Sequence, residues 1–137
     1  MNSLFTAIYD RFSSTTGSGF YNDLSGRMYL NNAPQETAFP YCVYFSVTDY
    51  DDLDFSEEHE DFLIQFNVFS ENNSAAEAGN LLESLKTMFD NCSLTVTDWR
   101  HLQFQRHLVI PNNNFTQVPP IHGYSIEYDV LLEKARS

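Results

Sequence analysis

Positive charge is scarce in this chain. Only seven of its 137 residues are Lys or Arg, against 19 Asp and Glu, which gives a formal net charge of −12 at pH 7. A protein that grips nucleic acid needs cations to displace the counterions of the phosphates, and an anionic membrane surface makes a similar demand. The composition therefore argues against both kinds of binding, although not against a position close to DNA.

Cysteine is also scarce, and long apolar runs are missing. Cys42 and Cys92 are fifty residues apart, so they form no CxxC pair, and two cysteines alone cannot complete a zinc site. We expect two buried, free thiols. No stretch approaches the roughly 20 apolar residues of a transmembrane helix, and the first twelve residues lack the basic start of a secretory signal. We therefore expect no membrane partner.

Sequence signatures of common enzymes are absent as well. The chain contains no GxSxG, P-loop, GxGxxG or HExxH motif. His101 and His107 are expected on one face of a strand together with Gln103 and Gln105, but six residues of strand span about 20 Å, too far for one metal ion. The sequence predicts no catalytic residues, no cofactor and no metal.

Apolar residues are plentiful, and their spacing predicts the fold. The chain is 42% hydrophobic with 12 Phe and 8 Tyr, enough for one domain over residues 1–137. Helical spacing predicts helices over 3–13 and 74–89, the second opened by a capping box of Ser74 and Glu77. Alternation predicts strands over 41–48, 62–70, 94–110 and 124–134, with a short edge strand at 27–31 and a turn-rich connection at 111–120. The class is α+β: a mostly antiparallel sheet of four to five strands, with two main helices packed on one face.

The alternation also predicts which side chains face the core. On the first long strand these are Tyr41 and every second residue to Val47. On the strand over 94–110 they are Leu102, Phe104, Leu108 and Ile110, with Arg106 as the charged exception and a bend or bulge near Trp99 and Arg100.

Residues 49–61, DYDDLDFSEEHED, concentrate the negative charge. Eight of these thirteen positions are acidic: Asp49, Asp51, Asp52, Asp54, Glu57, Glu58, Glu60 and Asp61. A calcium loop of the EF-hand type fails in both frames, because Leu53 and Asp54, or Glu57 and Leu63, occupy positions that need a ligand, a glycine or the final glutamate. Adjacent carboxylates in a polar turn stay ionised and do not separate into an acid and a base. We interpret the segment as the solvated tip of a hairpin joining 41–48 to 62–70.

Four phrases, in this order, make the chain similar to a known family. They are RMYLNNAPQETAFPYCVYF (27–45), FLIQFNVFS (62–70), FDNCSLTV (89–96) and YSIEYDVLLEK (124–134). Over nearly its whole length the chain resembles the tail-completion or tail-terminator proteins of long-tailed bacteriophages. The resemblance implies a virion protein, made in the host bacterial cytoplasm, that forms a ring, commonly a hexamer, at the head-proximal end of the tail tube. Such a ring stops tube polymerisation and joins the tail to the head connector, while DNA passes through without specific binding. Proteins of this family have no catalytic residues and no cofactor, so the resemblance implies neither for this chain.

Two surfaces follow as expectations from that resemblance. Apolar residues opposite the core positions would contact a neighbouring subunit: Tyr44, Leu63, Phe69 and Leu131. The acidic hairpin would face the lumen or the tail tube, since carboxylates repel the DNA backbone within a screening length of about 8–10 Å. The alternative is an exposed tip that only aids solubility.

Two further interpretations stay open. The chain could be another neck component, such as a head-completion stopper, or a small acidic binding protein that mimics DNA. A DNA mimic spreads its acids in strips spaced like phosphates, whereas eight of the nineteen acids here fall in one segment, which weakens that interpretation.

Overall fold

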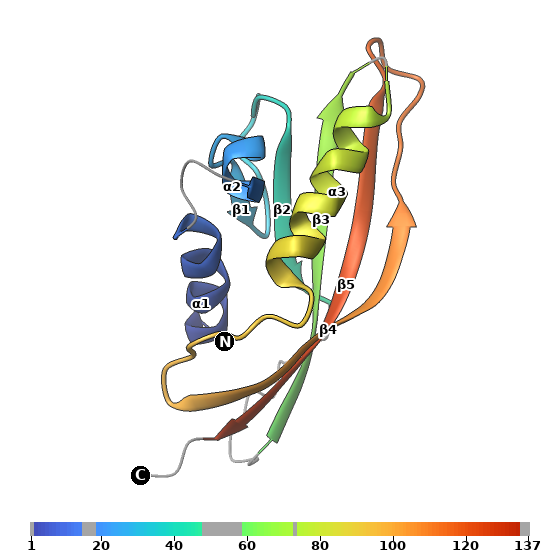
Figure 1. Ribbon diagram of the computed structural model, residues 1–137. Helices are drawn as coiled ribbons and strands as arrows, with labels where there is room; N and C mark the ends of the chain where they lie inside the picture. Colours follow the sequence, from blue (N-terminus) through green and yellow to red (C-terminus); the bar gives the residue numbers. More distant parts are fainter. Residues whose placement is uncertain (1, 15–18, 48–58, 73, 135–137) are drawn as a thin grey trace.

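The protein folds into one twisted sheet with helices packed against it (Figure 1). The computed structural model describes residues 2–14, 19–47, 59–72 and 74–134. The α+β class predicted from the sequence is confirmed. The order of elements is α1, α2, β1, β2, β3, α3, β4, β5, which adds one short helix to the predicted order.

The three helices are α1 (Asn2–Ser13), α2 (Gly19–Leu24) and α3 (Ala76–Phe89). The sequence did not predict α2, because its six residues, GFYNDL, are too few for a helical repeat; burial of Phe20 and Leu24 holds it in place. The predicted capping box of α3 is wrong. Ser74 Oγ accepts from the Ala76 N–H at 3.1 Å, while the Glu77 carboxylate accepts from the Ser70 hydroxyl instead.

The sheet has five strands in the order β1-β2-β3-β5-β4. They are β1 (Met28–Leu30), β2 (Tyr41–Ser46), β3 (His59–Glu71), β4 (Trp99–Pro111) and β5 (Ile121–Lys134). β1 pairs with β2 in parallel, and the other three pairings are antiparallel. The predicted β2–β3 hairpin is confirmed, with Tyr41 opposite Phe69 and Ser46 opposite Ile64. β1 and β4 form the two edges of this sheet.

One face of the sheet carries the hydrophobic core. On β3 the buried residues are Phe62, Ile64, Phe66 and Val68, and on β5 they are Ile126, Tyr128, Val130 and Leu132. All three helices add side chains to the same cluster, among them Ile8, Phe20 and Phe89. We call this the inner face, and the opposite side of the sheet the outer face. The predicted inward residues of β3 and β5 are correct.

The predicted phase of β2 is wrong. Cys42 and Tyr44 point into the core, whereas Tyr41, Val43 and Phe45 are half-buried on the outer face. Residues directly opposite each other in an antiparallel pair share a face, and Tyr44 lies opposite the buried Phe66. Because β2 is apolar on both sides, its own pattern shows the alternation but not which face is covered.

The predicted phase of β4 is also wrong beyond its middle. Its register shifts between His101 and Gln103 and again between Arg106 and Leu108. Each irregularity exchanges the two faces for the residues that follow. Leu108 and Ile110 are therefore 41% and 48% exposed, while Val109 packs against the core.

These shifts also separate the two histidines that were expected on one face. His101 lies opposite the buried Leu132, and its Nδ1 accepts from the Leu94 N–H at 3.2 Å. His107 is more than half exposed beside Asp129. Residues 94–98, predicted as strand, precede β4, which begins at Trp99.

Candidate interaction surfaces

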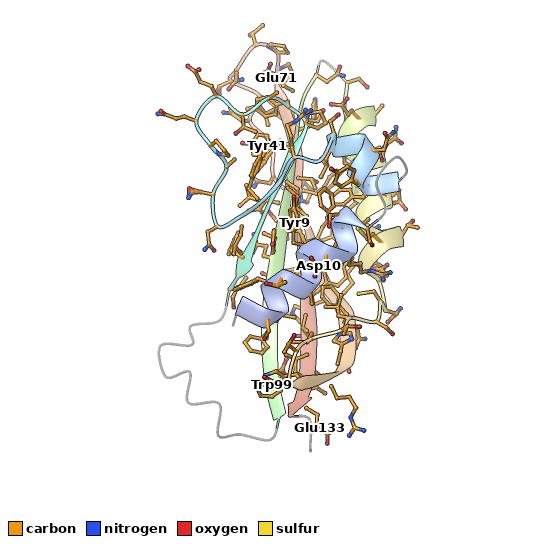
Figure 2. The ribbon with its side chains drawn as sticks, turned by 90° about the vertical axis from the view of Figure 1, so that its left-hand side faces the viewer. Tyr9, Asp10, Tyr41, Glu71, Trp99 and Glu133 are labelled. Carbon is orange, nitrogen blue, oxygen red and sulfur yellow. The ribbon has the colours of Figure 1, made fainter. Side chains whose placement is uncertain are left out.

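The acidic connection leaves the sheet at the end where β3 begins. Asp49, Asp51, Asp52, Asp54, Glu57 and Glu58 lie outside the described residues. Glu60 and Asp61 were predicted to lie in the hairpin tip, but they belong to β3. There they lie opposite Leu132 and Leu131 of β5. These two residues are part of a strand because β3 extends beyond the end of β2 and pairs there with β5. Figure 2 shows this end of the sheet near Glu133, far from Glu71 at the other end of β3.

Negative charge continues from this connection onto the outer face. Asp61 is exposed, and the pKa of its carboxyl is raised, first by partial burial and then by the charge of Asp129. On β5, Glu127 and Asp129 lie on the same face, and Asp129 Oδ2 is 3.7 Å from His107 Nδ1. Glu133 forms an ion pair with Arg100.

The four predicted interface residues do not form one patch. Leu63, Phe69 and Leu131 are half-buried on the outer face, as expected. Tyr44 is not: it is 2% exposed, on the inner face, and its hydroxyl donates to the Phe5 carbonyl at 3.4 Å. Burial raises the pKa of Tyr44 to about 12. The prediction that the Tyr44 side chain lies on the outer face is therefore wrong.

Polar side chains separate these apolar residues on the outer face. Leu63 lies opposite Asp129, and Leu131 lies opposite Asp61. Amide pairs lie on the central strand β3, where Gln65 Nε2 donates to Asn67 Oδ1 at 2.8 Å, and on the edge strand β4, where Gln103 Nε2 donates to Gln105 Oε1 at 2.6 Å. A surface of this mixed kind resembles the polar rim of an interface more than its apolar core.

A groove opens at the β1 edge of the sheet, beneath α1. It encloses about 310 Å³ and is lined by Phe5, Thr6, Tyr9, Asp10, Leu30 and Tyr44. Leu30 lies beside Tyr44 in the β1–β2 register, so β1 and β2 form the floor and α1 forms the wall. Figure 2 looks onto this edge, with Tyr9 and Asp10 on α1. No sequence pattern indicates the groove, because its residues come from three separate elements.

The β4–β5 connection, residues 112–120, carries the two most exposed large apolar side chains among the described residues. We call this connection the tip. Phe115 is 64% exposed and Val118 is 92% exposed. The base of the tip is held by Asn114 and Ile121, which exchange two backbone hydrogen bonds of 2.8 Å. Asn114 Oδ1 also accepts from the N–H and the hydroxyl of Thr116, at 3.1 and 2.7 Å. The sequence predicted the turn but not that it presents apolar side chains.

Polar side chains join the end of α3 to the sheet. Tyr128 donates to Asp90 Oδ1 at 2.7 Å, and Arg106 Nη1 is 3.6 Å from Asp90 Oδ2, so the end of α3 is joined to the sheet. Burial, and then the hydrogen bond to Asp90, raise the pKa of Tyr128. Cys42 and Cys92 are buried free thiols, as predicted, and burial raises the pKa of Cys92 to about 11.

Within the described ranges, no three His, Cys, Asp or Glu side chains come together as a metal site would require. In the same ranges, no helix has the length and apolar character needed to cross a bilayer.

Comparison with known proteins identifies similar folds but no family by sequence. No protein-family model matches the chain, and no curated protein matches it. A chain from a solved structure described as "Virion of native gene transfer agent (GTA) particle" aligns with a TM-score of 0.73 and 11% identity, over 93% of this chain and 92% of that one. A second solved chain aligns with a TM-score of 0.64 and 13% identity, over 99% of this chain and 97% of that one. At these identities the similarity shows a shared fold that covers nearly the whole of each chain.

Proposed function

We propose that the chain is a structural protein of a virion, and that it forms a ring at the head-proximal end of a phage tail tube. The ring stops tube polymerisation and helps to join the tail to the head. The observation that supports this most is the shared fold with a chain of a gene transfer agent virion over 93% of the sequence. The resemblance to tail-terminator proteins, stated from the residues alone, points to the same kind of particle.

The charge of the chain suits a ring through which DNA moves. A wall of Lys and Arg would hold the phosphates, whereas carboxylates repel them at short range. With a net charge of −12 on each subunit, a closed ring multiplies the negative charge around its hole. In this proposal DNA passes without specific binding, and the lasting partners are other copies of the chain, the tail tube protein and the head connector.

The direct test is electron microscopy of the purified protein, alone and mixed with tail tubes. We expect rings of uniform symmetry, commonly six-fold, seated at one end of each tube. Adding the protein to polymerising tube subunits should also halt growth. A protein that stays monomeric and ignores tube ends would contradict the proposal.

The acidic connection is a separate part of the proposal and needs its own variant. Asp51, Asp52, Asp54, Glu57 and Glu58 are changed to Asn or Gln together. We expect rings to form on tubes while DNA release slows, because the lumen then repels phosphate less. The control neutralises two exposed acids in other parts of the chain, Glu36 and Glu83. Normal DNA ejection and tail length in the acidic-connection variant would assign the segment to solubility alone.

A head-completion stopper is the second candidate, because the similarity is to a chain of a whole virion particle and does not distinguish places within it. A stopper binds portal–adaptor assemblies, whereas a terminator binds tube ends. Pull-down of the protein by each assembly distinguishes the two.

A further inference from the structure

We propose that neighbouring copies of this chain meet head to tail, with the tip of one subunit inserted into the groove at the β1 edge of the next. This proposal rests on the ring of the proposed function and adds the two surfaces that would build it. Phe115 and Val118 are the inserted side chains. Phe5, Tyr9, Leu30 and Tyr44 line the receiving groove.

Charge is distributed so that these two regions can approach each other. Subunits with a net charge of −12 repel, and the repulsion is least where both surfaces lack acids. Residues 108–126, which include the whole tip, contain no Asp, Glu, Lys or Arg. Residues 28–47, which supply the floor of the groove, contain one, Glu36. Residues 108–126 are the longest stretch without a charged side chain in a chain that is 19% charged.

The tip is held in a fixed conformation, and the groove has room for a large side chain. The tip projects beyond the sheet and is fixed by the hydrogen bonds around Asn114, so little conformational entropy is lost when it is immobilised. The ring of Phe115 is further oriented by an edge contact with His122, with 5.3 Å between the ring centroids. The groove, at about 310 Å³, is comparable with small ligand pockets and large enough for an aromatic side chain.

The one acid in the groove also suits this occupant. Asp10 lies at its rim on α1. Residues 112–120 bring no carboxylate of their own to meet it, and the Gln117 amide already donates to Glu71 of β3 at 2.7 Å. The side-chain amides of the Asn residues in the tip can donate hydrogen bonds to Asp10.

The positions of the two regions favour a closed ring over a symmetric dimer. The strand order places the groove at the β1 edge, whereas the tip joins β4 and β5 at the other side of the sheet. Two different patches on opposite sides of one subunit make a heterologous contact, which repeats from copy to copy until it closes.

The test uses cysteines at the two surfaces and a short bis-maleimide cross-linker. Phe115→Cys and Leu30→Cys proteins are prepared separately, mixed at ring-forming concentration and cross-linked. We expect dimers in the mixture and almost none with either variant alone. The double variant should give a ladder that ends at the ring size. The unsubstituted protein, whose Cys42 and Cys92 are buried, measures background.

Substitution of the tip provides the second measurement. Phe115→Ser combined with Val118→Ser should weaken self-association at least tenfold, since a buried aromatic anchor commonly dominates an interface. Val47→Ser is the control, because Val47 is also an exposed aliphatic residue but neither lines the groove nor belongs to the tip. Circular dichroism should show an unchanged fold in both.

Three outcomes separate this proposal from the proposed function. Cross-linking of Phe115→Cys protein to itself, or rings that form without the Phe115–Leu30 cross-link, would overturn the interface but leave the ring. A protein that forms no ring, alone or on tubes, would overturn both.

Discussion

Phe66 and Phe69 are three residues apart on β3, yet they lie on opposite faces of the sheet and have different surroundings. Phe66 is completely buried and contacts the rings of Tyr44, Phe89 and Tyr128. Phe69 lies on the outer face and is half-buried, with its ring 5.3 Å from that of Tyr41. The inner face is a continuous apolar layer beneath the helices, whereas the outer face mixes leucines, amides and acids. The same strands therefore serve stability on one side and leave the other side available for contacts.

The largest expected difference between the faces is in stability. Phe66→Ala should lower the free energy of unfolding by about 3–5 kcal/mol, because it leaves a cavity in a tightly packed core. Phe69→Ala, the matched control on the same strand, should cost about 1 kcal/mol. Chemical denaturation followed by circular dichroism measures both. Equal losses would show that the outer face is packed as tightly as the core.

The hydrogen bond that joins α3 to the inner face comes next in size. Tyr128→Phe removes the donor to Asp90 and leaves its half-buried carboxylate one hydrogen bond short, which costs about 1–3 kcal/mol. Tyr124→Phe, on the same face of β5, should change stability by less than about 0.5 kcal/mol. If the two variants unfold at the same denaturant concentration, the Asp90 contact does not stabilise the fold.

The two register shifts of β4 lead to a prediction opposite to that of the sequence pattern, because they change which residues near the end of the strand face the core. Val109→Ser should cost about 1–2 kcal/mol, because Val109 packs against the core after the second register shift. Leu108→Ser and Ile110→Ser, at exposed positions, should stay within about 0.5 kcal/mol of the parent. Thermal unfolding of the three variants decides between this arrangement and a regular strand, for which the order would be opposite.

The smallest effect concerns charge on the outer face. The folded protein raises the pKa of Asp61 above 3.8, so protonation favours the folded state, and stability is gained as the pH falls through the folded pKa. Asp129→Asn removes the neighbouring negative charge and should move the pKa of Asp61 down. Carboxyl titration by NMR measures the shift. Glu127→Gln, two residues away on the same face, is the control and should leave it unchanged.

How far the sequence predicts the fold depends on the strand considered. β3 and β5 alternate apolar residues with polar ones, and their core positions were predicted correctly. β2 is apolar on both sides, so the same reasoning placed Tyr44 on the wrong face. On β4 two bulges shift the alternation, but the apolar pattern of the sequence does not reveal them. The prediction continued the same alternation past both bulges and therefore assigned Leu108 and Ile110 to the core. α2 was missed because six residues are too few for a helical repeat.

Some of the candidate surfaces can likewise be predicted from the sequence, and others cannot. The acidic connection can be recognised in the sequence because charge is a property of single residues. The structure shows, however, that Glu60 and Asp61 belong to β3. The groove is invisible because it needs α1, β1 and β2 together. The exposure of Phe115 and Val118 is equally hidden, since an apolar residue in a turn can be covered or uncovered.

The sequence by itself determined the α+β class, the β2–β3 hairpin, the buried thiols and the concentration of negative charge. These follow from composition and from short-range periodicity. Only the tertiary structure decided which face of β2 is covered, where β4 changes phase, and that the charge-free tip lies at the end of the sheet opposite to the start of β3. Those depend on register and on packing between distant segments, which a local pattern does not encode.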